Sequence, residues 1–172
     1  MLQRLLLLPD LLPPQSPETT YWHEIVFDKS LLHLINELLR PEVFASDKRG
    51  MAETRVIAQG LLCKIFLHCL SRLIEDDGLV NGGSALSIWS NILDVLIRLL
   101  GSGQRDVVEE AVPESLKNVL LVMAAQGVLV QPSLGGGRVW DLTWQKLDRA
   151  LPKLRGEVFP GETKSSKEKT TE

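Results

Sequence analysis

Apolar residues recur at helical spacing along most of the chain, and this periodicity constrains the fold more than any other feature. The longest example lies between residues 52 and 75. Its apolar positions are Val56, Ile57, Leu61, Ile65, Cys69, Leu70 and Leu73, widened by Leu62, Phe66 and Ile74. A stripe this wide predicts a helix that contacts neighbours on more than one side.

A first helix is expected before this segment. Asp28 or Ser30 can cap it, and Pro41 should stop it, because proline cannot continue a helix. The apolar positions between them follow an i, i+3, i+4, i+7, i+8 pattern: Leu31, Leu34, Ile35, Leu38 and Leu39.

A further helix is expected after the acidic and glycine-rich "EDDGLVNGG". It begins at Ser84, with Asn81 or Ser84 as the capping side chain, and "GSG" at 101–103 ends it. Its apolar stripe comprises Leu86, Trp89, Ile92, Leu93, Leu96, Leu99 and Leu100.

Pro113 divides the next apolar stretch. Proline inside a helix costs about 3 kcal/mol, whereas at the first helical position its missing N–H matters little. The sequence therefore predicts a short helix over 104–111 and a separate one from Pro113 to about Gln126, closed by Gly127. A single kinked helix is the alternative. The inner stripe of the second helix is Leu116, Val119, Leu120 and Met123.

The last helix is predicted over 139–154, after a loop that includes a possible extended piece at 128–130. Pro152 should bend or end its final turn. Its apolar seam is Trp140, Trp144, Leu147, Leu151 and Leu154. The two tryptophans lie one turn apart, so they form either part of the core or an interface hot spot, and the core is favoured.

The predicted fold is all-α, with antiparallel helix pairs forming a piece of α-solenoid (armadillo-like) or an irregular bundle. No fixed-length repeat is visible. Residues 1–27 are expected to be an irregular Pro-rich segment, 28–160 the helical domain, and 161–172 a disordered tail without apolar residues. The apolar run from Leu5 to Leu8 is far shorter than the ~20 residues of a membrane span, and no other segment is expected to cross a bilayer.

Composition excludes some function classes. Nineteen basic and 22 acidic side chains give a formal charge of −3, which gives no electrostatic footprint for nucleic acid. Cys63 and Cys69 are the only cysteines, and six positions apart on a helix they point to different faces. Two buried free thiols indicate a reducing, cytosolic compartment.

No pattern of residues predicts catalysis, a cofactor or a metal site. His23, His33 and His68 fall in different segments, so they do not form a ligand set. "GGSAL" lacks the final glycine of a nucleophile elbow, and neither "GSGQRD" nor "GGGRV" has the Gly-Lys-Ser/Thr ending of a phosphate loop. The carboxylates at 75–77 are best interpreted as a solvated helix end. The prediction is a non-enzyme with no site residues.

Two stretches resemble a known family. "VPESLKNVLLVM" at 112–123, followed by "VWDLTWQKLDRALPKLRGEVFP" at 139–160, resembles the helical region downstream of the catalytic domain in large Golgi guanine nucleotide exchange factors for ADP-ribosylation factor. The closest type is the Golgi-specific brefeldin A-resistance factor. "KIFLHCLSRL" is similar to the helix that precedes these motifs, so the resemblance covers residues 54–160.

The resemblance implies a regulatory or membrane-targeting α-solenoid piece of an exchange factor, because the catalytic domain and its glutamate finger have no counterpart in the chain. The implied location is cytoplasmic, peripheral to Golgi membranes, in vesicle-mediated transport. The implied partners are other domains of the exchange factor, small GTPase regulators or Golgi membrane-associated proteins, with possible peripheral membrane contact. The oligomeric state stays open. The alternative is a free-standing adaptor that binds a partner helix in a groove beside Trp140 and Trp144.

Overall fold

The computed structural model describes residues 22–46, 48–77, 83–102, 107–131 and 137–160, and these contain helices and no strand. The helical elements are η3 (Glu24–Leu32), α2 (His33–Leu38), α3 (Pro41–Ser46), α4 (Lys48–Asp77), α5 (Ser84–Leu100), α6 (Val107–Ala125), α7 (Arg138–Ala150) and α8 (Leu154–Val158). The all-α prediction is confirmed. The predicted disordered tail lies outside the described residues.

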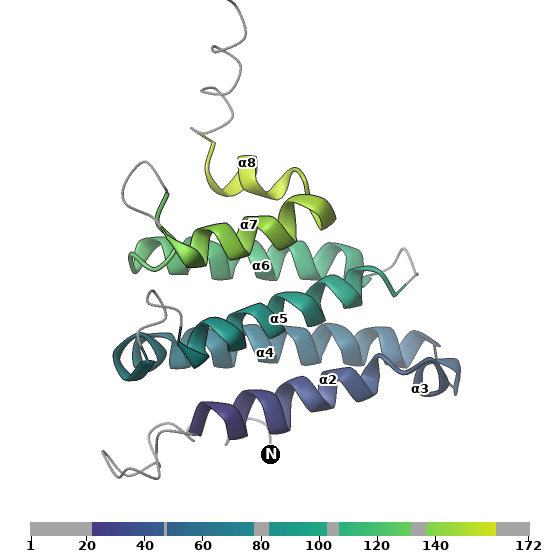
Figure 1. The fold of residues 1–172 in the computed structure, drawn as a ribbon. Coiled ribbons are helices and arrows are strands. Elements are labelled where there is room, and N and C mark those ends of the chain that lie inside the picture. Colours follow the sequence, from purple (N-terminus) through teal and green to yellow (C-terminus); the bar gives the residue numbers. More distant parts are fainter. Residues whose placement is uncertain (1–21, 47, 78–82, 103–106, 132–136, 161–172) are drawn as a thin grey trace, which may run out of the picture.

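The helices stack in two layers (Figure 1). Helices α4, α6 and α8 form one layer, with α4 packed most extensively on α6, while η3, α5 and α7 form the other. When η3 and α2 are counted as one continuous helix of the second layer and the short α3 is left aside, each layer takes every second described helix. This is the arrangement of an α-solenoid, in which each helix pair contacts the pairs before and after it.

One continuous hydrophobic core runs between the layers. Its largest fully buried side chains come from several helices: Trp89, Phe27, Phe66, Ile35, Leu62, Ile65, Leu70, Leu73, Ile88, Ile92 and Leu93. Phe66 of α4 stacks on Trp89 of α5, with ring centroids 5.0 Å apart, and contacts Phe27 of η3 edge-on. The wide stripe predicted for α4 is thus explained by neighbours on several sides.

The first helix begins earlier than predicted. Residues from Trp22 onward are helical, and η3 has π-type geometry that continues directly into α2. Its buried side chains return at intervals of four or five positions, at Trp22, Val26–Phe27 and Leu31–Leu32. Such spacing suits i→i+5 hydrogen bonding and does not match a period of 3.6.

The side chains predicted to cap the first helix have other roles. Asp28 accepts a hydrogen bond from Asn91 Nδ2 of α5 at 3.2 Å, and the Ser30 hydroxyl donates to the Ile25 carbonyl at 2.8 Å, one π-turn back. The helix does end before Pro41, as predicted. Pro41 then starts α3, a short helix that the sequence analysis missed.

Pro113 lies inside α6, so the prediction of two helices was wrong and the single-helix alternative is correct. Val108 and Val112 are buried on the same stripe as Leu116, and their burial carries the helix through the proline. The lost hydrogen bond would have reached the carbonyl of Glu109, an exposed residue in the first turn of α6, where water can replace it.

The other helix ends follow local chemistry. Gly127 adopts a left-handed φ of 72°, the Val128 N–H bonds to the Met123 carbonyl at 2.9 Å, and the Gly127 N–H bonds to Ala124 at 3.0 Å. This is a Schellman motif, and it confirms Gly127 as the end of α6. The N-cap of α5 is Gly83 without a side-chain hydrogen bond, so the prediction of Ser84 as cap was wrong; Asn81 lies outside the described residues.

Pro152 ends α7, as predicted, and Leu154 begins a separate helix, α8, instead of closing α7. A stretch of α4, Gly50–Glu75, is long and apolar enough to cross a membrane by length and composition, contrary to the expectation that no segment would be. Half of that window is buried inside the protein, as in the core helix of a solenoid.

Candidate interaction surface

The residues considered for chemistry do not converge. His23 is buried against Trp22 at the start of the first helix, whereas His33 on α2 and His68 on α4 are exposed. Among the residues that the structure describes, no three His, Cys, Asp or Glu side chains lie close enough to hold a metal ion. Glu75 is exposed near the end of α4.

Both cysteines are buried, and neither forms a disulfide. Desolvation raises the pKa of the Cys63 thiol to about 12, because burial disfavours the thiolate. Its thiol donates a long hydrogen bond to Oε1 of Gln59, at 4.0 Å. Cys63 is therefore a core side chain, not a nucleophile.

Buried polar side chains join the stacked helices. Nε1 of Trp89 on α5 donates to the Thr143 hydroxyl on α7 at 2.9 Å, and that hydroxyl donates to the Val139 carbonyl at 2.6 Å. Nε2 of Gln59 on α4 donates to the Ser115 hydroxyl on α6 at 3.1 Å. In each layer, a hydrogen bond of a buried side chain therefore links the two central helices and fixes their register.

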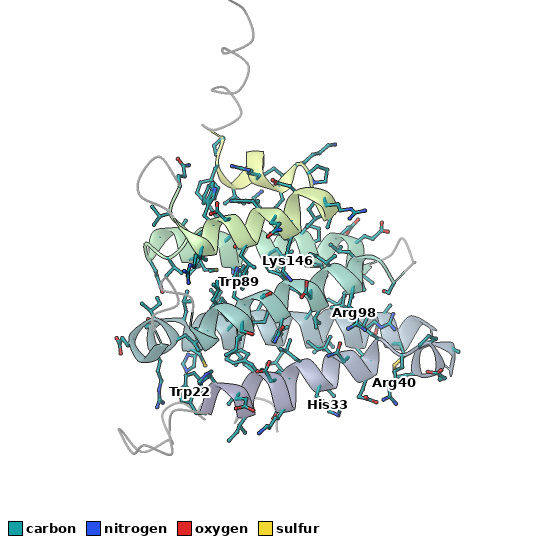
Figure 2. The ribbon with its side chains drawn as sticks, viewed as in Figure 1. Trp22, His33, Arg40, Trp89, Arg98 and Lys146 are labelled. Carbon is teal, nitrogen blue, oxygen red and sulfur yellow. The ribbon has the colours of Figure 1, made fainter. Side chains whose placement is uncertain are left out.

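Polar pairs also run along the outer face of the layer formed by η3, α2, α5 and α7. Arg98 of α5 donates to Asn36 of α2 at 2.8 Å. Lys146 of α7 pairs with Asp94 of α5, and Figure 2 shows Lys146 and Arg98 on opposite edges of α5. These side chains therefore pair with one another across the stack.

Trp140 and Trp144 belong to the core. Their rings lie 5.6 Å apart, both contact the ring of Phe159, and the Arg155 guanidinium lies over both at 5.3 and 5.4 Å. The segment that includes α8 therefore covers the tryptophans. The Trp144 N–H is buried and has no acceptor within the described part of the chain.

Exposed apolar side chains mark the surface that remains. The large ones are Ile25, Leu34, Ile57, Val107 and Leu121. Leu34 and Ile57 were predicted to be buried, and periodicity alone could not show this because both positions adjoin the apolar stripe. Three of the five lie on α4 and α6, which makes the outer face of that layer the candidate interaction surface.

Comparison with known proteins defines the family. Residues 1–154 match the family model described as "GBF1-like, tetratrico peptide repeat region". The chain belongs to this family. It is 35% identical over 147 residues to the ARF guanine-nucleotide exchange factor GNOM of Arabidopsis thaliana. It is 33% identical over 144 residues to the exchange factor GNL1 of the same plant. It is also 33% identical over 134 residues to the Golgi-specific brefeldin A-resistance guanine nucleotide exchange factor 1 homolog of Caenorhabditis elegans.

These alignments cover 81%, 79% and 78% of this chain but only 10%, 10% and 6% of the relatives. The chain thus spans a tenth or less of each relative's length. The resemblance inferred from the motifs is confirmed, and the family match extends it from residue 54 back to residue 1. No solved structure matches the chain.

Proposed function

We propose that the chain is a non-catalytic regulatory or targeting domain of a Golgi guanine nucleotide exchange factor for ADP-ribosylation factor, acting in vesicle-mediated transport. The observation that carries the proposal is the match of residues 1–154 to a repeat region named after such a factor. Relatives named as exchange factors for this GTPase support it.

The side-chain chemistry supports a scaffolding role. The fully buried hydroxyl of Thr143 and the buried amide of Gln59 hold one helix against the next. In solenoids each repeat packs on its neighbours, and the stack provides extended binding surfaces. The catalytic step of nucleotide exchange is assigned to another part of the larger protein.

The proposed location is the cytoplasmic face of Golgi membranes, with the domain held there by contacts with other domains of the exchange factor, small GTPase regulators or Golgi membrane-associated proteins. Two buried cysteines without a disulfide agree with a reducing compartment. The open outer face of α4 and α6 provides a surface for such contacts.

A point variant that unfolds only this domain tests the proposal. Leu93 is fully buried in α5, so Leu93→Asp places an unpaired charge in the core, whereas Ser87→Asp adds the same charge at an exposed position of the same helix. In the complete labelled exchange factor, Leu93→Asp should abolish Golgi recruitment and leave the exchange activity of the purified full-length variant in solution unchanged. Ser87→Asp should behave as the wild type.

Normal recruitment and normal exchange in cells with Leu93→Asp, or with residues 54–160 deleted, would refute a regulatory or targeting role. The reading frame offers a second check, since a catalytic exchange domain should be encoded upstream of this region. The adaptor alternative required an open groove beside Trp140 and Trp144. Both side chains are buried under Phe159 and Arg155, so no observation favours it.

A further inference from the structure

The exposed face of α4 has a composition that the fold of one chain does not explain. Glu53, Ile57, Gly60 and Lys64 follow one another at steps of four, three and four residues, which places them on one side of the helix. Ile57 is 64% exposed, the highest value among the large apolar side chains that are described as exposed. Lys64 is exposed and makes no ion pair with any residue that the structure describes.

Gly60 is the second unexplained feature of this face. A glycine inside a helix costs about 1 kcal/mol relative to alanine, and a Cβ at Gly60 would meet nothing within 4 Å. No packing among the described residues therefore requires glycine here. A missing side chain on an exposed helix face lets another backbone approach closely.

We propose that this face of α4 binds the same face of a second copy of the chain, with the two α4 helices antiparallel. In an interface with two-fold symmetry, each contact occurs twice. With the axis between residues 58 and 59, Ile57 of one copy lies over Gly60 of the other, and Glu53 of one pairs with Lys64 of the other. The side chains of this face are thus complementary, in size and in charge, to the same face of the second copy.

The neighbouring helix extends the same symmetry. The hydrogen bond between Gln59 and Ser115 aligns α4 with α6, so the axis meets α6 near residue 114. The exposed Val107 of one copy then lies near the exposed Leu121 of the other. Glu114, also exposed, lies close to the axis and opposes its own copy, which weakens the association and limits the dimer to high local concentration.

A membrane is the competing occupant, because α4 passes the length and composition test for a membrane span. The exposed face argues against it, since Glu53 and Lys64 would both have to enter the lipid, at a high cost for charged groups. The inference concerns only the exposed faces of α4 and α6 and does not rest on the proposed function.

Sedimentation velocity of the 172-residue chain over a range of concentrations tests the dimer. Gly60→Leu is the sharpest variant: it adds a strong helix former in open space, so the monomer should fold at least as stably while the dimer is lost. Ile57→Asp should weaken dimerisation about tenfold or more. Ile25→Asp, at a similarly exposed isoleucine on η3, is the matched control and should not affect dimerisation.

Charge reversal identifies the orientation. Glu53→Lys alone and Lys64→Glu alone should each weaken the dimer, and the double variant should restore it. Glu114→Gln should tighten it. A wild-type chain that stays monomeric at every concentration overturns the proposal. A dimer that persists in Gly60→Leu also overturns it, as does a double charge reversal that does not restore dimerisation. Binding of the chain to phosphatidylcholine vesicles, abolished by Gly60→Leu and Ile57→Asp while no dimer forms, would assign the face to a membrane instead.

Discussion

The hydrogen bond between Trp89 and Thr143 should be measurable as a contribution to the stacking of α5 on α7. Both side chains are fully buried, and the Thr143 hydroxyl is the acceptor for the Trp89 N–H at 2.9 Å. Thr143→Val keeps the shape of the side chain and removes the acceptor. A buried donor left without a partner costs about 1–3 kcal/mol, and the added methyl returns about 0.8 kcal/mol. The net loss of unfolding free energy should therefore be a few tenths of a kcal/mol to about 2 kcal/mol.

A double-mutant cycle with Trp89→Phe isolates the free energy of the hydrogen bond between Trp89 and Thr143. Phenylalanine has no N–H, so Thr143→Val should be close to neutral in that background, although Trp89→Phe itself is destabilising. The assay is urea unfolding followed by far-UV circular dichroism, analysed at a common slope. An equal cost of Thr143→Val in both backgrounds would refute the reasoning and assign the loss to packing.

Two further predictions concern α6 and α4. Pro113→Ala should raise the free energy of unfolding by about 2 kcal/mol at most. Removing proline from a helix interior gains about 3 kcal/mol, but the unfolded chain then loses a restriction worth about 1 kcal/mol. Urea unfolding measures the difference, and a lower free energy of unfolding would contradict the prediction. Cys63 should react with a thiol reagent at pH 8 only after unfolding, because its folded pKa is raised to about 12. The contribution of the neutral Cys63 thiol to the free energy of unfolding is fully present below pH 9. It is lost as the pH rises towards 12, because the thiol ionises at a lower pH in the unfolded chain than in the folded one.

The helices themselves could be predicted from periodicity, and the exceptions have identifiable causes. The start of the first helix was missed because Trp22 and Phe27 follow a π-type spacing that a 3.6-residue template does not detect. Pro113 was placed at a helix start because its local cost is large. The burial of Val108 and Val112 in the folded chain outweighs that cost. The apolar pattern before the proline is too short to reveal this burial from the sequence.

The candidate surface was less predictable than the core. Ile57 was assigned to the buried stripe of α4, since a wide stripe gives no sharp boundary between its edge and the exposed face. Exposure there is decided by where α6 and η3 lie, which is a property of the assembled stack. Gly60 carried a signal that the sequence analysis did not use: a glycine in the middle of a long helical pattern needs a reason.

The repeat architecture was hidden for a related reason. Tetratricopeptide repeats of about 34 residues reveal themselves as a fixed period, but α5 begins at Ser84 and α7 at Arg138, 54 positions later (138 − 84). The described helices differ in length, with 30 residues in α4, 13 in α7 and 5 in α8, so equivalent positions do not recur at a constant interval. The feature that recurs is a side-chain hydrogen bond between stacked helices. Gln59 donates one to Ser115 in one layer, and Trp89 donates one to Thr143 in the other. A solenoid can therefore keep its stacking while losing its sequence period, provided that each helix retains the side chains that fix it on the next.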